Sequence, residues 1–272
     1  MRKFFILLGI ILLFLTISVY YQKNTKTHLI APIEHITNQV PVEQVIENES
    51  KETVIEANPE KIQTPENSIE KKNVTPSALK IPNHTIPFFT HAPTGEWSDP
   101  RQQDGCEEAS AIMAMAWVQG KSFSNQEALQ EIITLANFEQ KKYGEHRDIS
   151  LQDIKAWIFK DYFNYSKVEV VMNVNKNDII NALEEGKLVL LPLNGQKLNN
   201  PYFTAPGPER HMLLVRDYDY KTDQFITNDP GTKRGENYHY SSQVIMNSIL
   251  VYPTGHHEAT NEKLKGMLVV NK

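Results

Sequence analysis

The sequence has only one cysteine, Cys106, which excludes an intramolecular disulfide. It also lacks paired cysteines and a His-Glu-x-x-His motif, so we predict neither a bound metal nor a cofactor. The formal net charge is −5, and no basic patch interleaves with aromatic residues, which argues against nucleic acid as a partner. There is no internal repeat either. The single thiol is therefore the most informative residue of this chain.

A long apolar run occupies residues 4–21, directly after Arg2 and Lys3. As a helix this run would be about 27 Å long, close to the hydrocarbon thickness of a bilayer. We predict that residues 1–21 form a signal-anchor transmembrane helix, with the domain that follows outside the cytoplasm as part of a single-pass membrane protein. A cleaved signal peptide, which would make the protein secreted, is the alternative. The lack of a small-x-small cleavage site after the run favours the anchor.

Residues 22–82 contain scattered prolines, many glutamates and lysines, and few aromatics. This composition buries too little apolar surface to offset the entropy of ordering the chain. We therefore predict a disordered tether with a mean reach of about 40–45 Å. From residue 83 to residue 272 apolar runs, aromatics and helix caps occur together, which predicts one monomeric domain.

In this domain helix signals come first and strand signals come later. Five helices are predicted: from Cys106 to a stop at Gly120, after a cap at Ser124, after a cap at Ser150, from Asn175 to Gly186, and over 242–249. Five strands are predicted, over 167–172, 188–193, 211–215, 224–227 and 267–270. The pattern predicts an α+β domain, with a helical layer that includes the Cys106 helix packed on an antiparallel sheet.

Cys106 begins the first of these helices, whose apolar residues follow a helical period. The N–H groups of a first turn and the positive end of the helix dipole stabilise a thiolate, the nucleophilic form of cysteine. A buried structural cysteine is the alternative, because free cysteine is commonly buried and a reactive thiol needs a base. An unpaired thiol in an exported protein is a liability unless it has a use, which favours catalysis.

His211 and Asp229 are the candidate partners of the thiol. His211 begins a strand beside a loop rich in proline and glycine, and Asp229 follows the next strand. If the two strands form a hairpin, both residues come to the same edge. The acid can then accept from one imidazole nitrogen and leave the other to face the thiol. The alternatives are a histidine without chemistry and an aspartate that only forms a turn.

Three segments, residues 86–110, 209–215 and 228–238, carry a family resemblance. They resemble, in order, the nucleophile, histidine and acid segments of papain-like cysteine peptidases related to the bacteriocin-processing (double-glycine leader) peptidases, above all the stand-alone exported branch. The resemblance implies a papain-like fold. It also implies that Cys106 is the nucleophile, that His211 is a general base and then acid, and that Asp229 orients His211.

The sequence departs from this family at one place. In the family a glutamine upstream of the cysteine donates to the oxyanion together with the backbone N–H of the cysteine, and this chain has His91 there. His91 can donate one hydrogen bond, and Gln102 and Gln103 lie closer to Cys106, so all three are candidates for the oxyanion hole. Loss of one such donor lowers a rate by about 100- to 1000-fold, which leaves a weak or inactive enzyme as an alternative.

We therefore predict a membrane-anchored, extracytoplasmic thiol peptidase that hydrolyses amide bonds of a peptide or protein through an acyl-enzyme. Acyl transfer and cell-wall amide hydrolysis would use the same chemistry. A non-catalytic module that binds peptide or cell wall, and a structural surface protein with an inert thiol, are the alternatives from other classes. Of the remaining residues, we interpret Glu107 and Glu108 as structural, with substrate contact as the alternative, 256–258 as a solvated loop and His239 as a sheet or loop residue. Trp97 and Tyr202 are candidate cleft walls, and core packing is the alternative for Trp97.

Overall fold

The computed structural model describes residues 85–261 and 263–272. The predicted anchor (1–21), the predicted tether (22–82) and the expected start of the domain at residue 83 lie outside the described residues. Within the described part, no helix is both long enough and apolar enough to cross a bilayer.

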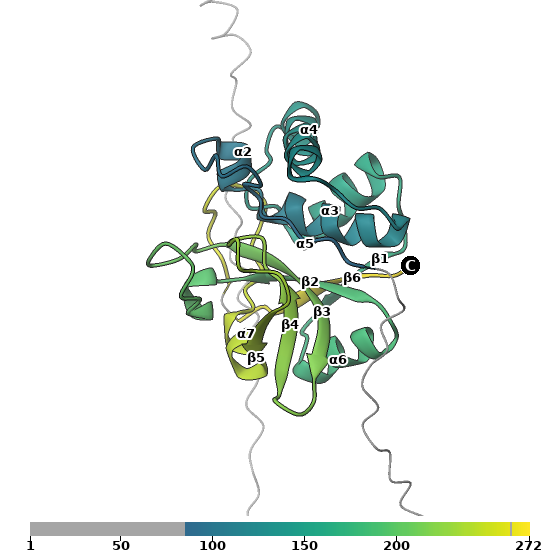
Figure 1. Ribbon diagram of the computed structural model, residues 1–272, viewed down its shortest axis with the longest axis vertical. Coiled ribbons are helices and arrows are strands. Elements are labelled where there is room, and N and C mark those ends of the chain that lie inside the picture. Colours follow the sequence, from purple (N-terminus) through teal and green to yellow (C-terminus); the bar gives the residue numbers. More distant parts are fainter. Residues whose placement is uncertain (1–84, 262) are drawn as a thin grey trace, which may run out of the picture. The chain divides into compact units, whose positions relative to one another are not determined.

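The described chain folds into helices and strands in mixed order (Figure 1). The helices are α2 (Pro100–Gln103), α3 (Cys106–Gln119), α4 (Asn125–Tyr143), α5 (Leu151–Asp153), the π-helix η1 (Ile154–Tyr162), α6 (Lys176–Glu184), the 3₁₀-helix η2 (Gly195–Leu198) and α7 (Ser242–Ser248). The strands are β1 (Val168–Met172), β2 (Leu188–Leu193), β3 (His211–Asp219), β4 (Gln224–Asn228), β5 (Tyr238–Ser241) and β6 (Gly266–Val270).

Local capping sequences set most of the helix ends. Helix α3 ends at Gly120, which adopts the left-handed conformation with φ of 66°. Helix α4 begins with a reciprocal capping box between Ser124 and Glu127, and α6 begins at the cap Asn175. These ends agree with the caps read from the sequence.

The strands form one antiparallel sheet in the order β1-β6-β2-β3-β4-β5. Strands β3 and β4 are the predicted hairpin, with Leu214 opposite Asn228. This register places the start of β3, where His211 lies, beside the chain that leaves β4. The mixed helices and antiparallel sheet confirm the predicted α+β class.

Successive residues of the central strands point into two separate cores. Leu190 and Leu214 join the core beneath α3, α4 and η1, whereas Leu191 and Leu213 join the core beneath α6 and α7. Figure 1 shows these two sets of helices on opposite faces of the sheet. Because both faces are covered, every residue of β2 is buried. Full burial of one such leucine stabilises the fold by roughly 1.5–3 kcal/mol.

Helix α2, the π-helix and strand β5 are not among the elements expected from the sequence. Helix α2 begins at Pro100, with the Asp99 side chain accepting from a first-turn N–H, and it fixes the turn before Cys106. Strand β5 is a short edge strand in which Tyr240 is buried and His239 is exposed. The position of His239 agrees with its interpretation as a sheet residue.

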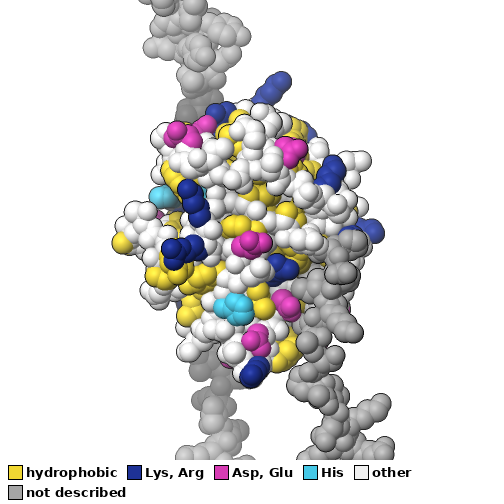
Figure 2. Space-filling model, in the orientation of Figure 1, with side chains coloured by type: hydrophobic (Ala, Val, Ile, Leu, Met, Phe, Trp, Pro, Cys, Tyr) yellow, Lys and Arg dark blue, Asp and Glu magenta, His cyan; other side chains and the backbone are white. Residues whose placement is uncertain are grey.

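Charged side chains are mixed over the visible surface. On the face in Figure 2, lysine and arginine side chains and aspartate and glutamate side chains are scattered among uncharged areas. A cleft lined by charges of one sign would therefore differ from the mixed surface seen on this face.

Candidate active site

Cys106 is the first residue of α3 and follows a glycine at the N-cap. A Cβ atom on Gly105 would lie 2.5 Å from the carbonyl oxygen of Arg101, so only glycine fits this turn. The turn places the thiol at the N-terminal end of a helix that packs on β3. Cys106 is buried there, with 7% of its surface exposed.

The Cys106 thiol donates a hydrogen bond to its neighbour Glu107, with 3.0 Å between Sγ and Oε2. Burial, and then the negative charge of Glu107, raise the pKa of the thiol well above its usual value. Among the described residues, no hydrogen bond joins Cys106 to His211. In this arrangement the thiol is protonated and is hydrogen-bonded to the Glu107 carboxylate.

Glu107 is itself fully buried. Its other oxygen, Oε1, accepts from the hydroxyl of Tyr252 at 2.7 Å. Burial, together with the nearby charge of Asp148, raises the pKa of Glu107 to about 7. The carboxyl group in contact with the thiol therefore changes charge near neutral pH.

His211 and Asp229 lie side by side, as the hairpin predicts, with 2.8 Å between Nε2 and Oδ1. Both are almost completely buried. An ionised carboxylate only accepts, so Nε2 carries a hydrogen, and Nδ1 is the nitrogen that can act as a base whenever the ring is neutral. Asp229 thus fixes the tautomer that a general base at Nδ1 requires.

Further hydrogen bonds hold Asp229 in place. Tyr240 donates to Oδ2 at 2.6 Å, the Gly231 N–H donates to Oδ1 at 2.9 Å, and the Asn200 amide donates to the Tyr240 hydroxyl at 2.6 Å. Burial opposes ionisation of Asp229, but the charge of His211 and these hydrogen bonds outweigh it and lower the pKa of the carboxyl. Asp229 is therefore an ionised carboxylate whose position is set by hydrogen bonds from His211, Tyr240 and Gly231.

Cys106 and His211 line the same cleft, which has a volume of about 430 Å³. Phe203 covers His211 on one side, edge to face, with ring centres 5.4 Å apart. On another side a Cβ on Gly231 would lie 3.0 Å from His211 Cε1. The structure thus brings the candidate nucleophile and base to one cleft, with Asp229 behind the histidine.

His91 lines this cleft as well, but its ring already has a partner. Nδ1 donates to the carbonyl oxygen of Gln102, because a carbonyl can only accept. Burial lowers the pKa of His91 to about 4, so the ring is neutral at neutral pH and its Nε2 is an acceptor. In this orientation His91 has no N–H left for an oxyanion, and donation would require the ring to turn or its proton to move.

The two glutamine candidates face different ways. Gln102 is buried and is not part of the cleft lining, and only its backbone carbonyl oxygen contacts His91. Gln103 is exposed and lines the cleft with Cys106. Of the three oxyanion candidates, Gln103 therefore has both a side-chain N–H and a place on the cleft wall.

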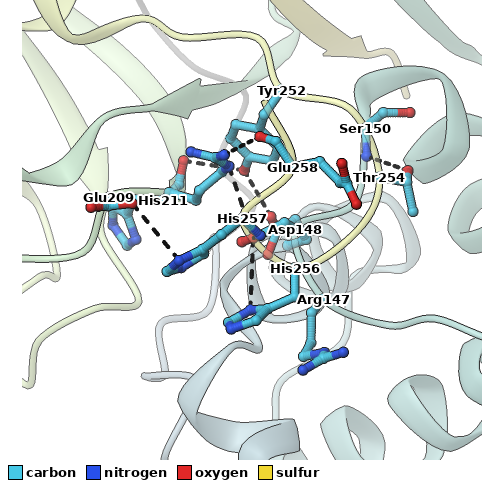
Figure 3. Close-up of polar contacts among 12 residues, drawn as sticks. Arg147, Asp148, Ser150, Glu209, His211, Tyr252, Thr254, His256, His257 and Glu258 are labelled. Atoms are coloured by element: carbon cyan, nitrogen blue, oxygen red, sulfur yellow. Dashed lines mark hydrogen bonds and ion pairs between the residues drawn. The ribbon is translucent and has the colours of Figure 1, made fainter. Parts of the chain in front are cut away.

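Two loops that line the cleft, one before α5 and one between α7 and β6, together contain a group of described residues that could offer ligands to a metal. Asp148, His256 and His257 have candidate ligand atoms within 4.8 Å of one another. Asp148 Oδ2, however, already accepts from the His257 backbone N–H at 2.7 Å and faces Arg210 Nε at 3.9 Å. Figure 3 shows His257 reaching Glu209, with 3.8 Å between Nδ1 and Oε2. A backbone hydrogen bond and an ion pair thus tie the loop that contains His257 to the cleft residues Asp148 and Glu209.

Of the two candidate cleft walls, Trp97 lines the cleft that contains Cys106 and His211, and Tyr202 does not; Tyr202 lines a neighbouring pocket. Trp97 and Tyr202 are 39% and 44% exposed, among the most exposed large hydrophobic residues described. No sequence pattern indicates the contacts of Tyr240 with Asp229, 11 positions away, or of Tyr252 with Glu107, 145 positions away.

Comparison with known proteins adds the family. A family model described as the peptidase C39-like family matches residues 85–257. No curated protein matches the chain. One solved structure, from Bacillus anthracis and named as a C39-like peptidase, is 12% identical, with 70% of this chain and 96% of that chain covered and a TM-score of 0.39.

Proposed function

The chain belongs to the peptidase C39-like family, and we propose that it is a cysteine peptidase in which Cys106, His211 and Asp229 act together. The family match confirms the resemblance seen in the sequence and, with the observed helices and antiparallel sheet, the papain-like α+β fold. The observation that carries the proposal is the His211–Asp229 hydrogen bond in a cleft shared with the only cysteine.

The proposed reaction begins with proton transfer from Cys106 Sγ to His211 Nδ1, the nitrogen that Asp229 leaves free. The thiolate attacks the carbonyl carbon of a peptide bond, and the imidazolium then donates its proton to the departing amine. Water, activated by the same nitrogen, releases the acyl group from sulfur. Asp229 stabilises the imidazolium throughout and holds the ring in place.

Charge on the substrate oxygen would be stabilised at the start of α3. The N–H groups of a first helical turn have no partners within the helix, and the helix dipole is positive there. We assign the second donor to Gln103 rather than His91, because Gln103 lines the cleft and its side-chain amide has no hydrogen bond to another described residue, while His91 donates to the Gln102 backbone. The substrate would be a peptide or protein outside the cytoplasm, reached from the predicted membrane anchor in residues 1–21.

Alkylation of the full chain by iodoacetamide tests the thiol–imidazole pair, because Cys106 is the only thiol to label. We expect the labelling rate near pH 7 to fall at least about tenfold in His211→Ala, and to fall less in Asp229→Asn. His239→Ala is the matched control, since His239 is an exposed histidine of the sheet edge. Equal, slow labelling in wild type and both site variants would refute the proposal.

A peptide-binding module on the same fold is the second candidate, and one observation favours it. The thiol rests on the Glu107 carboxyl, and its pKa is raised by burial and by that charge, whereas a ready nucleophile has a lowered pKa. A module of this kind would bind peptides with Cys106→Ala as well as with wild type, and it would cleave none.

A further inference from the structure

A second pocket, of about 470 Å³, opens beside the catalytic cleft. Trp97, Thr204 and Gly231 line both hollows, so the pocket continues the cleft that contains Cys106 and His211. We call it the basic pocket. A peptide held across Cys106 would extend into it within a few residues of the bond under attack.

The charges that line the basic pocket have one sign. Lys233 and Arg234 are exposed there, and its lining contains no carboxylate. Neither residue forms an ion pair with another described residue. The Arg234 guanidinium instead lies over the ring of Tyr202, with its central carbon 4.6 Å from the ring centre. Two cations thus stand next to exposed aromatic surface from Trp97 and Tyr202.

The part of the catalytic cleft that the basic pocket does not share has the opposite character. Asp104, Asp148 and Glu209 line it. Asp148 faces Arg210 and Glu209 faces His257, so the negative charges of these two acids are partly neutralised within the protein. The groove therefore changes from mixed and acidic to purely basic along its length. Such a change favours one direction for a bound chain that carries charge.

We propose that the basic pocket binds a carboxylate of the peptide substrate, close to the bond that Cys106 attacks. The proposal rests on the proposed function and names the substrate class: peptides with an acidic side chain, or a free C-terminus, beside the cleavage site. A guanidinium offers paired N–H donors that match a carboxylate, and an ammonium adds a second charge. Trp97 and Tyr202 would cover the apolar part of the same residue.

Capped peptides with Glu, Gln or Lys at single positions around the cleaved bond test this on the full chain. We expect the wild type to prefer Glu over Lys at one position by about tenfold in kcat/KM. This ratio corresponds to a free-energy difference of roughly 1.4 kcal/mol. In Lys233→Glu with Arg234→Glu the preference should reverse, and in Lys233→Gln with Arg234→Gln it should disappear. Lys121→Glu reverses a lysine in a hollow that shares no lining residue with the cleft or the basic pocket, and it should keep the wild-type preference.

Peptides with a free and an amidated C-terminus distinguish the two sources of carboxylate. Preference for the internal Glu in amidated peptides assigns the pocket to a side chain, and preference for the free end without Glu assigns it to the C-terminus. Cleavage without any preference between Glu, Gln and Lys, and between free and amidated ends, would overturn the proposal while the proposed function stands.

The pocket can also be tested if no peptide is cleaved and the proposed function fails. Binding of the same peptides to Cys106→Ala, measured by isothermal titration calorimetry, should show the same order, with Glu or free-end peptides binding about tenfold more tightly than Lys peptides. Equal affinities, or affinities unchanged in Lys233→Glu with Arg234→Glu, would overturn the proposal without reference to catalysis.

Discussion

At the scale of single residues, the charge of Glu107 governs the state of Cys106. The two groups share a hydrogen bond in a buried environment, where a second negative charge is especially unfavourable. Because the pKa of Glu107 is about 7, the carboxyl is partly protonated at neutral pH. In its protonated form it can donate to a thiolate instead of repelling it. The titrations of the two groups are therefore coupled.

Glu107→Gln should make Cys106 more reactive at pH 7–8. The substitution removes the opposing charge and keeps an oxygen that can accept from Tyr252. We expect the thiol pKa to fall by about one unit, which raises the labelling rate about tenfold at a pH below the thiol pKa. The pH dependence of iodoacetamide alkylation measures this, with the exposed Glu236→Gln as control. A slower or unchanged rate would show that Glu107 activates the thiol or does not act on it.

Tyr240→Phe isolates the support of the candidate acid. The variant loses the donor to Asp229 Oδ2 and leaves the Asn200 amide without its partner. We expect the free energy of unfolding in urea to fall by about 1–3 kcal/mol and the pKa of Asp229 to rise. Tyr238→Phe is the matched control, because Tyr238 packs on Tyr240 without contacting Asp229 through its hydroxyl. Equal stability of the two variants would mean that the Tyr240 hydroxyl contributes little.

At the scale of elements, the junction of α2 and α3 determines where the thiol lies. Gly105→Ala would place a methyl group 2.5 Å from the backbone of Arg101, and the junction would have to open. We expect about 1–3 kcal/mol of destabilisation in urea, and a changed rate of Cys106 labelling. Gly144→Ala, at the left-handed end of α4 with open space around it, should lose stability through backbone strain alone and keep the wild-type labelling rate.

The elements that the sequence predicts are those encoded locally. The cap at Ser124, the cap at Asn175 and the stop at Gly120 each need only a few neighbouring residues, and the structure confirms them. The meeting of His211 and Asp229 also follows from local patterns, because two adjacent strands form a hairpin. The π-helix over Ile154–Tyr162 does not, since the same caps and apolar residues fit an ordinary helix.

Contacts between distant segments explain what the sequence leaves out of the site. Tyr252 reaches Glu107 across 145 positions, and no pattern around either residue indicates the other. Tyr240 reaches Asp229 from an edge strand that was not expected. The direction in which the His91 ring donates depends on the path of α2, which places the Gln102 carbonyl against it. Candidate residues can thus be chosen from spacing, but their hydrogen-bond partners come from packing.

At the scale of the whole molecule, several buried carboxyl groups have no cationic partner among the residues that the structure describes. Glu108 of α3 and Glu139 of α4 are both fully buried and face each other across the helix pair. Burial, and then the charge of Glu139 and Glu107, raise the pKa of Glu108 well above its usual value, and burial raises the pKa of Glu139 as well. With Glu107, these groups make the core beneath α3 dependent on pH.

The folded chain should therefore lose stability as pH rises above about 6.5. The pKa values of Glu107, Glu108 and Glu139 are higher in the folded than in the unfolded state, so the folded state binds more protons. Their contribution to the free energy of unfolding is complete below about pH 4.5 and is lost as the pH rises through their folded-state pKa values. His91, with its pKa lowered to about 4, has the opposite effect only below its unfolded value of 6.5. Urea unfolding at pH 6.5, 7.5 and 8.5 should show a falling free energy. Glu108→Gln with Glu139→Gln should flatten that fall, Glu236→Gln should not, and a flat wild-type profile would contradict the charge-burial argument.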